Sequence, residues 1–161
     1  MRRPNWARLN RWLALAVRLY LGWLFLDASW HKIAHPASFA LDVATYQFLP
    51  LYLVNVFAII VPWVEAVTGV LLLVGARVRA AALLVVGMMI AFMIALAWAL
   101  HLGLDMSCGC FASQGAVGED PISGWTMLRD GTWLALGLYV LFADKNPLGM
   151  DTWMARGRRP R

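Results

Sequence analysis

Long apolar runs separated by short polar stretches dominate this chain. Four runs are long enough to cross a hydrocarbon core, which takes about 20 residues of helix. They cover residues 12–33, 51–75, 79–103 and 125–143. The fourth run is the weakest, because Arg129 and Asp130 interrupt it near its start. The pattern predicts an all-α integral membrane protein, a four-transmembrane-helix bundle forming a single domain over residues 1–161.

Composition supports a membrane location. Hydrophobic residues make up 61% of the 161 residues and charged residues 14%, against about 45–50% and 25% in soluble domains. A core of this size cannot hide so much apolar surface. The lipid bilayer is therefore the first predicted partner.

Basic residues cluster in three places that lie on one side of a four-span topology: before the first span, between the second and third, and after the fourth. They are Arg2, Arg3, Arg8 and Arg11, then Arg77 and Arg79, then Lys145, Arg156, Arg158, Arg159 and Arg161. The positive-inside rule then predicts cytoplasmic termini in a bacterial inner membrane, with the other two loops facing the periplasm. Because topology accounts for these charges, the net charge of +5 predicts no nucleic-acid partner.

The two cysteines of the chain form the motif Cys108-Gly109-Cys110 in the second external loop. On the oxidising side of a membrane, such a pair can cycle between dithiol and disulfide. One thiolate would attack a disulfide and the second thiol would resolve the mixed intermediate. A ring closed over one glycine is strained, and strain makes a disulfide more oxidising. Cys108 and Cys110 are therefore the predicted catalytic residues.

Four polar residues at the outer helix ends are predicted to support the cysteines. Asp27, His31 and Lys32 lie near the end of the first span, and His101 lies near the end of the third. A nearby imidazolium or ammonium group would lower a cysteine pKa and favour the thiolate. The alternative is ordinary solvation of helix ends.

Arg18 and Glu65 are ionisable residues inside predicted spans, where charges are costly and usually paired or functional. We expect an interhelical ion pair between them or a shared polar pocket, to which Pro62 contributes by freeing a backbone carbonyl. The alternative for Arg18 is that its side chain extends to the cytoplasmic surface.

Each of the four spans contains one of the glycines Gly22, Gly69, Gly87 and Gly137. Small residues let membrane helices approach closely. All four are predicted to be packing contacts.

Several segments resemble a known family. The stretch from Arg18 to Phe39, the segment Pro62-Trp63-Val64-Glu65 and the run from Gly69 to Gly75 are similar to the DoxX superfamily of four-helix membrane proteins. Cys108-Gly109-Cys110-Phe111 resembles the MauE branch, the methylamine-utilisation membrane proteins. The resemblance implies a redox-associated role outside the membrane. MauE-type proteins are linked to maturation of a disulfide-rich periplasmic dehydrogenase, and DoxX relatives occur with thiosulfate:quinone or thiol-oxidation systems.

Three functions remain open from the sequence. The first is a membrane thiol–disulfide redox protein, with a periplasmic thioredoxin-like protein as partner and a membrane quinone as the cofactor that accepts electrons. The second is a non-catalytic subunit or scaffold of a larger respiratory or redox complex. The third is a metal-binding or delivery protein that uses the cysteines with His31, His35 or His101. No resident metal is predicted.

Overall fold

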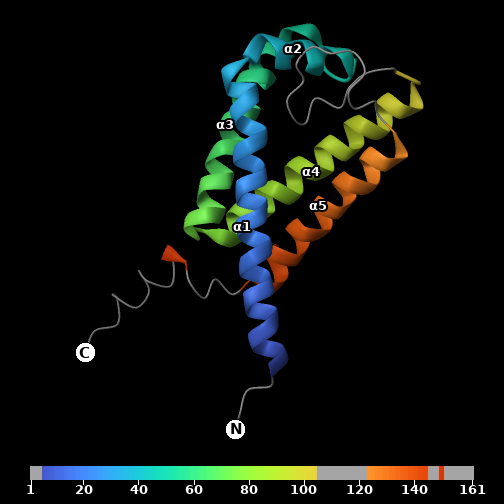
Figure 1. The fold of residues 1–161 in the computed structure, drawn as a ribbon. Helices are drawn as coiled ribbons and strands as arrows, with labels where there is room; N and C mark the ends of the chain where they lie inside the picture. The colour runs from blue at the N-terminus through green and yellow to red at the C-terminus, as the bar shows by residue number, and fades with distance from the viewer. Residues whose placement is uncertain (1–4, 105–122, 145–148, 151–161) are drawn as a thin grey trace.

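The computed structural model describes residues 5–104, 123–144 and 149–150. Within this part the chain forms five α-helices and no β-strand (Figure 1). The helices are α1 (Asn5–Ala34), α2 (Pro36–Thr45), α3 (Leu51–Val74), α4 (Val78–His101) and α5 (Gly124–Ala143). The predicted all-α class is confirmed.

Three of these helices are long and apolar enough to cross a membrane: Leu9–Ala34, Leu51–Val74 and Val78–His101. The predicted fourth span corresponds to α5, which is helical over nearly the predicted range but carries Arg129 and Asp130. It is not among the three candidate spans. The count of four spans therefore stays a prediction.

The helix boundaries follow from local signals. Pro50 precedes α3, and Gly75 ends it in the left-handed conformation with φ 73°. The amide of Gly75 donates to the carbonyl of Leu71 at 2.9 Å, a common way to end a helix. The short α2, which no long apolar run indicates, begins at Pro36, where proline suits the first helical turn.

The helices pack as two pairs. Between α1 and α3, which form the most extensive pair, Gly22 and Gly69 bring the backbones into close contact. In the other pair, Gly137 of α5 faces Val85 and Val86 of α4. The pairs meet at a buried core drawn from α1, α3, α4 and α5: Leu21, Phe25, Leu72, Val78, Ala81, Ala82, Val85 and Val140. From there they diverge toward the end of the molecule that carries α2 (Figure 1).

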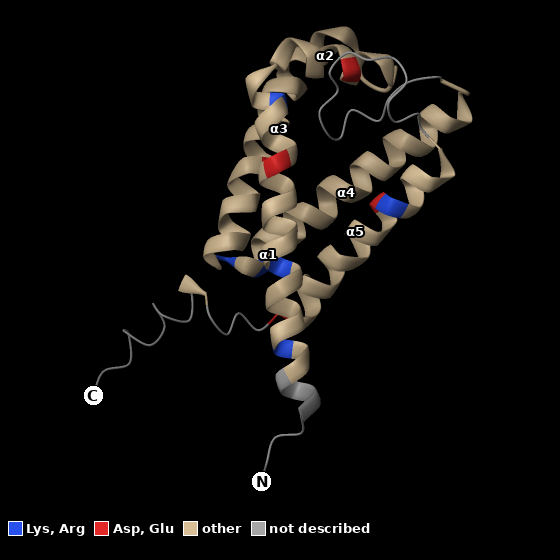
Figure 2. Ribbon diagram, in the orientation of Figure 1, with Lys and Arg blue, Asp and Glu red and all other residues tan. Residues whose placement is uncertain are grey.

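The outer surface of the helices is mostly apolar. Charged residues are sparse along α3 and α4, where Glu65 and Arg79 are the only Lys, Arg, Asp or Glu (Figure 2). Large side chains such as Trp23, Trp63 and Leu83 are more than half exposed. Such a surface is suited to contact with lipid, in agreement with the apolar composition of the chain.

Candidate functional site

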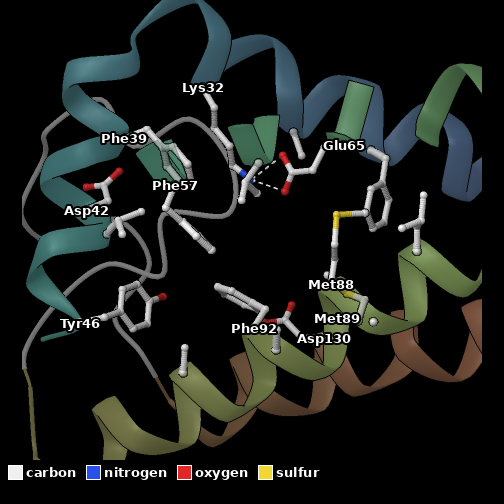
Figure 3. A pocket seen from close by; sticks show the side chains of 18 of the residues that line it. Lys32, Phe39, Asp42, Tyr46, Phe57, Glu65, Met88, Met89, Phe92 and Asp130 are labelled. Atoms are coloured by element: carbon white, nitrogen blue, oxygen red, sulfur yellow. Dashed lines mark hydrogen bonds and ion pairs between the residues drawn. The ribbon is translucent and has the colours of Figure 1, made fainter. Parts of the chain in front are cut away.

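A cavity of about 470 Å³ lies in the wedge where the two helix pairs diverge (Figure 3). Residues of α1, α2, α3, α4 and α5 line it, and most of them are apolar or aromatic. Four charged residues interrupt this lining: Lys32, Asp42, Glu65 and Asp130. An apolar pocket with a few convergent polar groups is the usual form of a small-molecule site.

Lys32 and Glu65 form an ion pair at the wall of the cavity (Figure 3). The Lys32 Nζ donates to Glu65 Oε1 at 2.8 Å and to Oε2 at 2.9 Å. The side chains are only 11% and 12% exposed, so water screens the pair weakly. It joins the last turn of α1 to the middle of α3.

Local sequence places both groups. Phe57, Val61 and Glu65 recur every four residues on α3, so they share the face that lines the cavity. Lys32 lies in the last turn of α1, where a cation interacts favourably with the helix dipole. Its Nζ also lies 5.1 Å from the centroid of the Phe39 ring, within the range of a cation–π contact.

Replacing Lys32 with Met should destabilise the protein by about 2 kcal/mol, because Glu65 loses a charge-assisted partner while mostly buried. The double variant Lys32→Met/Glu65→Leu should recover most of this loss, since neither charge then remains. Thermal unfolding in detergent checks both. A double variant no more stable than Lys32→Met would contradict a direct interaction.

The structure gives Arg18 and Glu65 different partners. Arg18 Nη1 lies 3.3 Å from Asp144 Oδ2, just past the end of α5, and the two side chains are 2% and 0% exposed. Arg18 and Lys32 are separated by about 21 Å along α1 at 1.5 Å per residue. Glu65 pairs with Lys32, the cation nearer the C-terminal end of α1, and the expected Arg18–Glu65 pair is replaced by two separate ones.

The other predicted residues are placed as follows. Asp27 and His31 are exposed on α1, and His101 is exposed at the end of α4; none of the three lines the cavity. Cys108 and Cys110 lie outside the described residues. Within the described part, no group of three or more His, Cys, Asp or Glu side chains is arranged to hold a metal ion.

Sequence reasoning missed several polar and aromatic residues of this region. Asp42 belongs to α2, Tyr46 follows the last residue of α2, and Asp130 belongs to α5; all three line the cavity. The sequence could have indicated Asp130, because an acid within an apolar membrane helix is by default a functional or paired group. Its Oδ1 lies 3.3 Å from Arg129 Nε.

The apolar helices and the cavity define the class of this chain: it is a multi-helix integral membrane protein with a charge pair in an apolar cavity. The family model described as "Methylamine utilisation protein MauE" matches residues 10–143, and the chain belongs to that family. The resemblance to MauE is thereby confirmed, and the wider DoxX resemblance stays a prediction.

One curated relative supports the same assignment. The chain is 32% identical over 126 residues to "Methylamine utilization protein MauE" of Paracoccus denitrificans. The alignment covers 78% of this chain and 66% of that protein, slightly less than two thirds of its length. No solved structure matches the chain.

Proposed function

We propose that this chain is a membrane thiol–disulfide redox protein that acts through Cys108 and Cys110 on the periplasmic side. The observation that carries the proposal is the position of the motif in the chain. Cys108-Gly109-Cys110 falls between α4 and α5 in the sequence. The C-terminal end of α4 and the N-terminal end of α5 lie at the end of the molecule that carries α2 (Figure 1). Residues of α2, α4 and α5 also line the cavity.

The proposed topology has four spans, with α5 as the fourth and both termini in the cytoplasm. Two observations support it. First, α5 runs antiparallel beside α4 over a similar length (Figure 1). Second, Arg77 and Arg79 lie at the turn between α3 and α4, opposite the end that carries α2, and a basic turn favours the cytoplasmic side. The motif then faces the periplasm of a bacterial inner membrane.

The proposed reaction is a reversible exchange with a partner protein. A thiolate of the partner attacks the Cys108–Cys110 disulfide, and a mixed disulfide forms while one cysteine leaves as thiolate. The partner's second thiolate then resolves the mixed disulfide. The partner loses two electrons and becomes a disulfide, and Cys108 and Cys110 gain them and become thiols. A periplasmic thioredoxin-like protein, or a disulfide-rich protein of methylamine utilisation, has the required chemistry.

Replacing both cysteines with serine should abolish the exchange. In spheroplasts, a membrane-impermeant maleimide should add two labels per chain after reduction and none after oxidation with diamide, and it should never label the double variant. One of the single variants, Cys108→Ser or Cys110→Ser, should accumulate a mixed disulfide with an oxidised partner. In the reverse direction of the exchange its remaining thiolate attacks the partner disulfide, and the chain then has no second cysteine to resolve the mixed disulfide.

Ser107→Ala is the matched control, because it changes a neighbouring side chain without removing a sulfur. It should label and exchange like the parent protein. If the label count does not respond to the redox state, the motif does not cycle and the chain is a non-catalytic subunit. If the reagent reaches the thiols only after the membrane is permeabilised, the proposed orientation is wrong.

A further inference from the structure

The cavity has the size and lining of a site for a lipid-soluble ring. Its volume of about 470 Å³ falls within the range of small-molecule pockets, roughly 300–1,000 Å³. Aromatic side chains line it, among them Phe39 of α2, Tyr46 just past the end of α2, Phe57 of α3 and Phe92 of α4. Tyr46 and Phe92 already meet edge to face, with centroids 6.3 Å apart. A planar ring would find both faces and edges to pack against.

The charges that line the cavity select the type of ligand. Among the described lining residues, three are acids and one is a lysine, so an anionic lipid headgroup would meet a net negative wall. A cationic ligand would compete with Lys32 for Glu65, which already accepts two hydrogen bonds from it. A neutral ligand would not be repelled by the acids of the wall, and it would leave the Lys32–Glu65 ion pair intact.

Lys32 also supplies the polar contact that a neutral ligand needs. An ammonium group has three N–H donors, and two of those on Lys32 point to the oxygens of Glu65. The third donor suits a carbonyl oxygen of a neutral ring. The ligand would arrive through lipid, because apolar side chains cover the outer faces of the surrounding helices.

We infer that this cavity binds the ring of an isoprenoid quinone, with Lys32 donating to one ring carbonyl and the isoprenoid tail leaving toward the lipid. Quinones combine a flat neutral ring, two carbonyl oxygens and an apolar tail. The binding of the ring is argued from the described residues alone, whereas a role for the quinone in electron transfer rests on the proposed function. In that role the quinone reoxidises the chain: the Cys108 and Cys110 thiols become a disulfide, and their two electrons and two protons convert the quinone to the quinol.

Gly87 offers a way to fill the cavity without disturbing the fold. It lines the cavity, and a Cβ atom built there meets no heavy atom within 4 Å. Gly131 of α5 is the matched control, because a Cβ atom there is equally unhindered and the residue does not line the cavity. Both changes replace a helical glycine with a better helix former.

The test titrates decylubiquinone into the full chain in lipid nanodiscs and follows quenching of tryptophan fluorescence. The parent and Gly131→Leu should bind equally, and Gly87→Leu should bind about tenfold more weakly or not at all. The variant Lys32→Met/Glu65→Leu, which lacks the donor without leaving a lone charge, should also bind about tenfold more weakly. Oleate, an anionic lipid probe, should bind more weakly than the quinone.

Equal quinone affinity in the parent and Gly87→Leu would overturn the inference, as would tighter binding of oleate. The outcome is separable from the proposed function, because the Cys108→Ser/Cys110→Ser variant should bind decylubiquinone like the parent. A parent that cycles its thiols but binds no quinone would refute the cavity site alone. A parent that binds quinone but never cycles its thiols would refute the redox function alone.

Discussion

Replacing Asp144 with Ala is expected to destabilise the protein by about 3–5 kcal/mol, because it leaves the Arg18 guanidinium without its carboxylate in a buried position. Arg18 is 1% exposed, and its Nη1 lies 3.3 Å from the Asp144 carboxylate. The pair fixes the end of α5 against α1, so its loss should loosen the whole bundle. Thermal unfolding of the purified protein in detergent, followed by circular dichroism, measures the effect.

Two further variants show whether the ion pair causes this loss. Asp27→Ala removes an exposed carboxylate from α1 and should change the stability by less than about 0.5 kcal/mol. The double variant Arg18→Met/Asp144→Ala removes both charges and should be more stable than Asp144→Ala alone. If Asp27→Ala and Asp144→Ala lower the free energy of unfolding by the same amount, the Arg18–Asp144 pair does not stabilise the bundle.

The sequence predicts the long helices closely because hydrophobic runs and helix terminators both mark their ends. The runs 51–75 and 79–103 differ from α3 and α4 by one or two residues, since Pro50, Gly75 and the basic turn bound them. α1 begins earlier than expected, at Asn5, because arginine is a good helix former and does not end a helix. The short α2 was missed, because its ten residues are far fewer than the long apolar run that marks a membrane span.

Hydropathy identifies the charged residues inside the helices but not their partners. Glu65 was expected to face a cation, and it does, but the cation is Lys32 rather than Arg18. The choice depends on the rotation and crossing of α1 against α3 and α5, which close glycine contacts and core side chains determine. An apolar run contains no such information, so the partner Asp144 beyond the fourth run was also missed.

The glycines show the same limit. Three of the four predicted packing glycines are confirmed, because a Cβ atom at Gly22, Gly69 or Gly137 would approach a neighbouring helix within 3.1 Å or less. The prediction for Gly87 is wrong: this residue borders the cavity, and a Cβ atom there meets nothing within 4 Å. Spacing along a helix cannot distinguish these cases, because a glycine that admits a second helix and one that borders a cavity look alike in sequence.

Replacing Gly69 with Leu is expected to destabilise the protein by about 3 kcal/mol, because overpacking forces helices apart. A Cβ atom at this position would lie 2.8 Å from the carbonyl oxygen of Gly22 and 3.2 Å from the backbone nitrogen of Leu26. Backbone atoms cannot rotate away as side chains do, so α1 and α3 must separate. Chemical unfolding in mixed micelles measures the loss.

Alanine at two helical glycines separates this packing effect from the general effect of removing a glycine. Gly69→Ala should still destabilise the protein, because the added methyl group meets the backbone of α1. Gly87→Ala should leave the stability unchanged or raise it by up to about 1 kcal/mol, since its methyl group is unhindered and alanine favours the helix. Stability changes of opposite sign in the two variants would support a close α1–α3 contact. Equal gains in stability would show that these helices do not approach each other through Gly22 and Gly69.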